Sequence, residues 1–210
     1  MAGEWVRERL RGRGLSVTGL IPLQTDTALV IGTKNEQNLA GLNLDPKTRL
    51  ISRVRALGFR RVCLIPAEVV HVPDWADLRC RFGCALYGKP ACPPDSPSPR
   101  KTRDLLKNCT TALLLEGEPP AGAFQRRVLR AEKEAFAAGF YKAFAFWAGP
   151  CALCTPCAPG GVCGNPRQSG PSMEGAGIDV FASVRRAGLS LRTLPGPGDF
   201  VKYFALVLLE

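Results

Sequence analysis

Residues 110–147 read TTALLLEGEPPAGAFQRRVLRAEKEAFAAGFYKAFAFW, and this stretch decides the fold. An apolar run over 110–116 is typical of a buried strand. A helical pattern follows over 122–138, with apolar side chains on one face at Phe124, Val128, Ala131 and Ala135. Gly139 ends this helix, and large and small residues then alternate over 141–147, as in a strand. The stretch therefore predicts a strand, a helix and a second strand in succession.

Helices and strands also alternate on both sides of this stretch. The flanking elements are bounded by capping and turn residues, and they are a helix from Asp45 to Gly58, a strand at 61–65, a helix from Ser98 to about Asn108, a helix at 178–187, and strands at 189–194 and 201–209. The last two strands, joined by Pro195-Gly196-Pro197-Gly198, predict an antiparallel pair. The alternation predicts an α/β fold with a mixed, partly parallel sheet flanked by helices.

The chain has 210 residues, which is enough for one domain with an extension. Residues 1–45 are interpreted as an N-terminal extension, and residues 46–210 as an α/β cysteine-rich metal-binding domain. The N-terminus has no apolar stretch of signal-peptide length, and no apolar run reaches the roughly 18 residues that span a bilayer. We therefore expect a cytoplasmic protein without membrane insertion, in a compartment where thiols stay reduced.

The formal net charge is +10. Such a surplus attracts nucleic acid, an anionic cofactor or an acidic protein partner. Aromatic residues do not interleave with the basic ones, as a platform for single-stranded nucleic acid would require. Nucleic acid is therefore a disfavoured partner and stays an alternative.

Most of the nine cysteines fall into two groups. The first group is Cys80, Cys84 and Cys92, and the second is Cys151, Cys154, Cys157 and Cys163. In a reducing compartment, clustered thiols favour metal ligation over disulfides. Both groups are expected in loops that follow strands, where open α/β sheets carry their sites, so we expect the two metal-binding loops at one edge of the sheet.

The second group lies in residues 149–172, a segment rich in glycine and proline with few apolar side chains. Such a segment cannot bury enough surface to offset the entropy of ordering it, and a metal would supply the missing cross-links. The spacing from Cys151 to Cys157 resembles a ferredoxin cluster loop, and Cys163 has the reach to complete the site. A [4Fe–4S] cluster is the first choice, and a four-cysteine zinc site is the alternative.

The first group offers three thiolates, which could hold a second cluster with one open iron position. A structural zinc site is the alternative for this group too. The two cysteines outside the groups, Cys63 and Cys109, lie beside apolar residues and are interpreted as small buried side chains. His71, the only histidine, is interpreted as structural.

Several separated motifs carry a resemblance to a known family. They are Cys80-Arg-Phe-Gly-Cys84, Ala91-Cys92-Pro93-Pro94, Gly139-Phe-Tyr141-Lys142, Gly149-Pro150-Cys151-Ala-Leu-Cys154, Cys163-Gly-Asn-Pro166 and Pro171-Ser172-Met173-Glu174. Over about residues 50–210 the chain resembles a prokaryotic family labelled only as predicted metal-binding proteins. The resemblance implies a metal–cysteine site without an assigned reaction. It also implies a further cysteine after Pro-Ser-Met-Glu, where this chain has Gly175-Ala176-Gly177.

The expected function is electron transfer or redox support of a partner enzyme by an iron–sulfur protein with one cluster or two. Two alternatives stay open. One is a non-redox zinc-binding interaction module, and the other is an enzyme that binds substrate at a three-cysteine cluster.

Overall fold

The structure is a computed structural model that describes residues 45–157, 162–193, 196 and 201–210. Asp45–Glu210 form one compact unit, and every described residue belongs to it. The predicted N-terminal extension lies outside the described residues except for Asp45.

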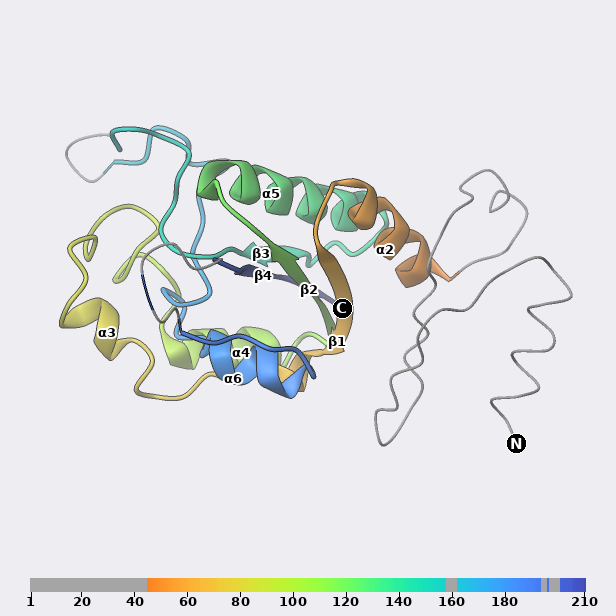
Figure 1. The fold of residues 1–210 in the computed structure, drawn as a ribbon, viewed down its shortest axis with the longest axis horizontal. Coiled ribbons are helices and arrows are strands. Elements are labelled where there is room, and N and C mark those ends of the chain that lie inside the picture. Colours follow the sequence, from red (N-terminus) through yellow and green to blue (C-terminus); the bar gives the residue numbers. More distant parts are fainter. Residues whose placement is uncertain (1–44, 158–161, 194–195, 197–200) are drawn as a thin grey trace, which may run out of the picture. The chain divides into compact units, whose positions relative to one another are not determined.

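Four strands form one sheet in the order β1-β2-β4-β3, and the sheet lies between two layers of helices (Figure 1). The strands are β1 (Arg61–Pro66), β2 (Thr111–Gly117), β3 (Phe144–Phe146) and β4 (Tyr203–Leu209). Every neighbouring pair is antiparallel. The prediction of a partly parallel sheet is therefore wrong.

The direction of β2 explains this error. β2 begins beside the end of β1, where Pro66 is paired with Thr111 and the Ala67 N–H donates to the Thr110 carbonyl at 3.0 Å. The chain between them runs out under the sheet and returns through the helix α4 (Pro99–Leu106) (Figure 1). The helix between these two strands therefore belongs to a long connection that returns to the same end of the sheet, and it does not form a crossover between parallel strands.

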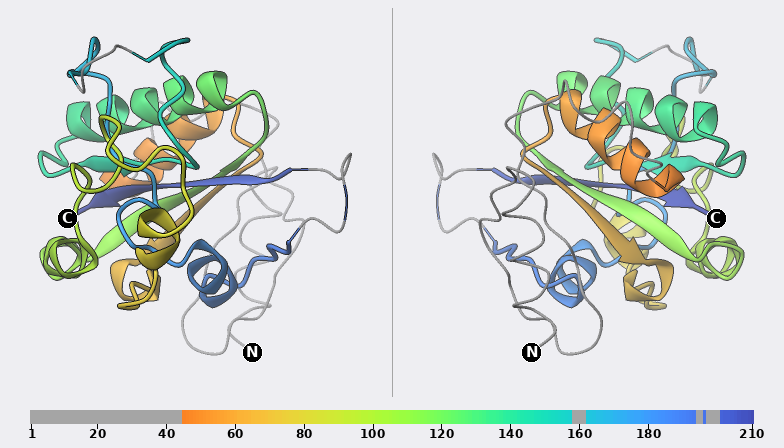
Figure 2. Two further views of the ribbon diagram at one scale, coloured as in Figure 1. Left: turned by 90° about the vertical axis from the view of Figure 1, so that its left-hand side faces the viewer. Right: turned by 90° about the vertical axis from the view of Figure 1, so that its right-hand side faces the viewer.

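Helices cover both faces of the sheet. One layer contains α2 (Pro46–Ala56) and α5 (Ala121–Ala137), and the other contains α4 and α6 (Val180–Arg186) (Figures 1 and 2). Two short helical segments also occur in the described part of the chain, the 3-10 turn Ala67–Val69 and α3 (Leu78–Arg81). As predicted, Asp45 caps α2 by accepting from the Lys47 N–H at 2.9 Å, and Ser98 caps α4.

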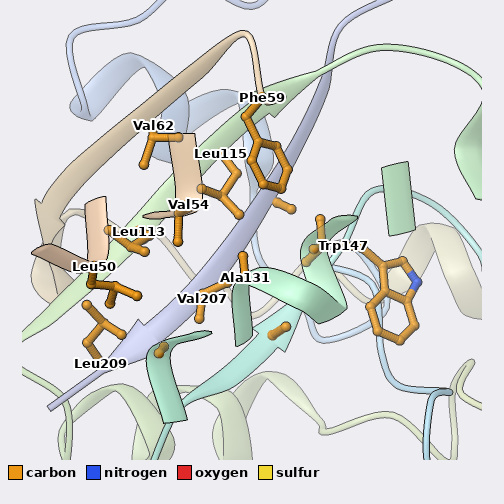
Figure 3. Packing of buried hydrophobic residues seen from close by; sticks show 14 of the residues in the cluster. Leu50, Val54, Phe59, Val62, Leu113, Leu115, Ala131, Trp147, Val207 and Leu209 are labelled. Atoms are coloured by element: carbon orange, nitrogen blue, oxygen red, sulfur yellow. The ribbon is translucent and has the colours of Figure 1, made fainter. Parts of the chain in front are cut away.

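The central strands are buried on both faces because helices lie on both sides. On β2, Leu113 and Leu115 pack toward α2 and α5, whereas Ala112 and Leu114 pack into the opposite core. Figure 3 shows the first of these cores, where Leu50 and other α2 residues meet the sheet. Burial on both faces accounts for the continuous apolar runs, which are more typical of parallel strands.

Most predicted elements exist, and some of them are shorter than predicted. The strand predicted at 141–147 is reduced to Phe144–Phe146, and the helix at 178–187 to Val180–Arg186. Residues 189–193 form no strand, so the predicted closing pair is wrong. The reason is that β4 already has β2 on one flank and β3 on the other, while Leu189 and Leu191 pack as an irregular segment on the core next to α6.

No helix among the described residues is long and apolar enough to cross a membrane.

Candidate metal centre

The two cysteine loops reach the same end of the sheet by different routes. The second loop continues directly from β3 and therefore starts beside the first residues of β4. The first loop follows β1, which runs opposite to β3, so the two loops leave the sheet at opposite ends and do not both start from the carboxyl-end edge on which the expectation was based. Residues 67–77 return beneath the sheet to α3, and in this way the first loop reaches the same end of the sheet as the second loop (Figure 1). Seen from that end, both loops face the viewer (Figure 2, left).

Two buried hydroxyls hold the chain after the first cysteine group against the segment that contains Gly175. The Ser96 hydroxyl donates to the Gly175 carbonyl at 2.6 Å, and the Thr102 hydroxyl donates to the Ala176 carbonyl at 2.7 Å. A Cβ built on Gly175 would lie 3.6 Å from a carbon of the Pro93 ring. These contacts fix the position of Cys92, the residue before Pro93.

The second loop is held by Gln125 at the start of α5. This side chain is only 1 % exposed. Its Nε2 donates to the Cys151 Sγ at 3.3 Å, and its Oε1 accepts from the Ala152 N–H at 2.7 Å. A Cβ on Gly122 would approach the Ala152 carbonyl oxygen to 2.9 Å, so the glycine permits close packing of the helix on the loop.

Asn165 connects two members of the second group. Its side-chain Nδ2 donates to the Cys154 Sγ at 2.9 Å, and its backbone N–H donates to the Cys163 Sγ at 3.3 Å. Cys154 and Cys163 thus share one neighbour although they are separated along the chain. Together with Gln125, Asn165 supplies N–H donors to three thiols of this group.

Cys92 lies within electrostatic reach of both groups. Burial is the main cause that raises the pKa of its thiol, and negative charge at neighbouring thiolates raises this pKa further, in the order Cys84, Cys80, Cys151 and Cys157. Because Coulomb interactions weaken with distance, this influence places members of both groups around Cys92. Cys92 therefore lies near Cys80 and Cys84 of its own group and near Cys151 and Cys157 of the second group.

The thiols of the two groups differ in exposure. Cys84 and Cys157 are exposed, and the other five are half-buried. Burial raises the pKa of Cys80, and the charges of Cys84 and Glu174 add to that effect. Among the residues that the structure describes, no three Cys, His, Asp or Glu side chains are arranged to hold a metal ion.

The side chains interpreted as structural lie elsewhere. Cys63 and Cys109 pack against the core between the sheet and α6, and burial raises the pKa of both thiols. The His71 backbone N–H donates to the Ser183 hydroxyl at 2.9 Å, and its carbonyl accepts from the Asp179 N–H at 2.8 Å. These contacts tie residues 70–72 to the start of α6.

The sequence analysis assigned no role to Gln125, Asn165 or Glu174, although Asn165 and Glu174 lie in motifs that carry the family resemblance. The only signals were a polar side chain beside Phe124 on an otherwise apolar helix face and an asparagine two positions after Cys163. Glu174 accepts from the Gly149 N–H at 3.2 Å. Solvent reaches this side chain, yet the protein atoms that enclose it raise the pKa of the carboxyl, and hydrogen bonds from Gly149 and Ser172 partly oppose the rise.

Comparison with known proteins identifies the family of the chain. A family model described as "Predicted metal-binding protein (DUF2284)" matches residues 63–209. A search of curated proteins and a search of solved structures each found no match. The matched range contains both cysteine groups and all four strands except the first two residues of β1. The chain therefore belongs to this family of predicted metal-binding proteins.

Proposed function

We propose that the chain is an iron–sulfur protein, in which Cys151, Cys154, Cys157 and Cys163 hold a [4Fe–4S] cluster. The observation that carries this proposal is the set of N–H donors at three of these sulfurs, at Cys151 from Gln125 and at Cys154 and Cys163 from Asn165. Donors of this kind stabilise the thiolate form, which is the form that ligates metal. Hydrogen bonds to sulfur also set the potential of iron–sulfur clusters, so this donor set fits such a group.

The first group, Cys80, Cys84 and Cys92, is proposed to hold a second metal site. Three thiolates leave one position to be filled by another ligand or by a bound molecule. Because Cys92 lies near members of the second group, two sites would be close neighbours. When bound, the clusters would supply one-electron transfer, and the residues of this chain would orient them and limit their contact with water.

A redox partner protein is the proposed recipient or source of the electrons. Large apolar side chains are exposed around the first group, at Trp75, Leu78, Phe82, Leu86 and Tyr87. Weak electron-transfer encounters use small surfaces of this kind. Cytoplasmic residence, where thiols stay reduced, is part of the same proposal.

The decisive experiment is anaerobic purification after iron-replete expression. We expect a brown protein with about four irons per chain, or about eight if both sites are filled. A colourless protein with stoichiometric zinc would favour the alternative, a non-redox zinc-binding interaction module.

Ligands are tested with a matched pair of variants. Cys154→Ser should lose iron and sulfide, because it removes a proposed ligand. Cys109→Ser should keep the metal of the parent, because this thiol packs against the opposite core. Equal metal content in the two variants would contradict the ligand assignment.

A further inference from the structure

A cavity of about 890 Å³ lies beside the second cysteine loop. It lies where the chain after β3 leaves β4. β3 pairs with β4 only from Phe144 to Phe146, and beyond it Ala148–Ala152 form a wall of the cavity while Tyr203 and Phe204 of β4 form another. The start of α6 lines it as well. Clefts of about 300–1,000 Å³ are the usual size for sites of small molecules.

The walls combine aromatic rings with a proposed metal ligand. Phe181, Tyr203 and Phe204 line the cavity, and so does Cys151. Phe181 is 40 % exposed, so its ring is accessible from solvent. A mainly apolar wall with a few polar groups is typical of sites for organic ligands.

Among the lining residues that the structure describes, positive charges outnumber negative ones. Arg192 and Lys202 line the cavity, opposed by Glu174. The buried carboxylate of Glu116 is paired with two cations. Its Oε1 lies 3.5 Å from the Lys202 Nζ, and its Oε2 lies 3.6 Å from the Arg61 Nε. Two cations on one carboxylate leave a positive charge over.

We propose that this cavity binds a small aromatic carboxylate. Its carboxylate would pair with the cations Arg192 and Lys202, and its ring would pack against Phe181 and Tyr203. A ligand in this position lies next to Cys151. Binding itself needs no metal, so the proposal stands independently of the proposed function.

The test compares phenylacetate with its neutral isostere phenylacetamide, by calorimetry and saturation-transfer NMR on anaerobically purified protein. We expect phenylacetate to bind with a millimolar or lower Kd and the amide to bind about tenfold more weakly, because the amide cannot form the ion pair. Arg192→Gln should remove most of this preference, and Phe181→Ala should weaken both ligands.

The matched control is Arg185→Gln, an exposed position on α6 that does not line the cavity; it should bind like the parent. No phenylacetate binding, equal binding of acid and amide, or equal effects of Arg192→Gln and Arg185→Gln would each overturn the proposal. The iron content of every sample is measured in parallel. Metal without binding contradicts the cavity proposal alone, and binding without iron contradicts the iron–sulfur proposal alone.

Discussion

Gln125→Leu should weaken the attachment of the second cysteine loop to α5. The replacement keeps much of the side-chain volume in a position that is 1 % exposed, but it removes both polar contacts. The Ala152 N–H loses an acceptor at 2.7 Å, and the Cys151 Sγ loses a donor at 3.3 Å. The variant therefore tests the hydrogen bonds with little change in packing.

The magnitude follows from the amide that is left behind. An unsatisfied buried donor costs about 1–3 kcal/mol, and Ala152 is half-buried, so water can replace part of the lost bond. The contact with sulfur adds little, because neutral hydrogen bonds contribute about 1 kcal/mol at most in net terms. The added apolar surface of leucine offsets some of this. We expect the free energy of unfolding to fall by about 1–2 kcal/mol.

The assay is urea unfolding of reduced, metal-free protein, followed by circular dichroism, with Gln168→Leu as the matched control. Gln168 is exposed, and surface substitutions usually change stability by less than about 0.5 kcal/mol. A second readout is the rate at which protease cuts residues 149–172, which should rise in Gln125→Leu only. If the two variants are equally stable and equally resistant, Gln125 does not hold the loop and the reasoning is refuted.

Three further outcomes are expected. Asn165→Leu should lower the reduction potential of the bound cluster, because hydrogen-bond donors to sulfur favour the reduced state. The control is Asn108→Leu, at a position just after the end of α4. Equal reduction potentials of the two variants in electrochemistry would show that the Asn165 contacts are irrelevant. Removal of metal should expose residues 149–172 to protease and spare α5, since the core has its own apolar contacts; equal cleavage in both forms would show that the loop is ordered without metal. Glu132→Gln should gain stability over the parent as pH rises from about 4 to neutrality. Burial raises the pKa of Glu132 in the folded state. The protonated carboxyl therefore contributes its full stability below the pKa of the unfolded state, and this stability is lost as the pH rises through the pKa of the folded state. A pH-independent difference in urea unfolding would contradict this.

Local signals predicted the elements well because they depend on neighbouring residues. Asp45 and Pro46 marked the start of α2, and Ser98 marked that of α4. Strand direction failed for the opposite reason. Whether β2 runs with or against β1 depends on the path of residues 67–110, and no property of either strand encodes it.

The same distinction between local and tertiary signals applies to the candidate site. Cysteine spacing pointed to the thiols, because loop ligands of one centre lie close along the chain. Gln125 and Asn165 could not be identified from sequence spacing, because each contacts a sulfur only after folding brings the two residues together. The approach of Cys92 to the second group likewise depends on the tertiary structure.

The direct contact between Ala67 and Thr110 makes β1 and β2 an expanded hairpin. Its register is set by the strand pairing and this closing bond, and α4 completes the core beneath it. Residues 73–97 between these points contain no strand and contribute only Pro90 and Ser96 to the buried interior. The segment with Cys80, Cys84 and Cys92 thus adds little to the buried core of the scaffold. Protein engineers could graft another ligand loop between Pro73 and Ser96, keep the Ser96 hydroxyl contact, and leave the scaffold that carries the loop unchanged.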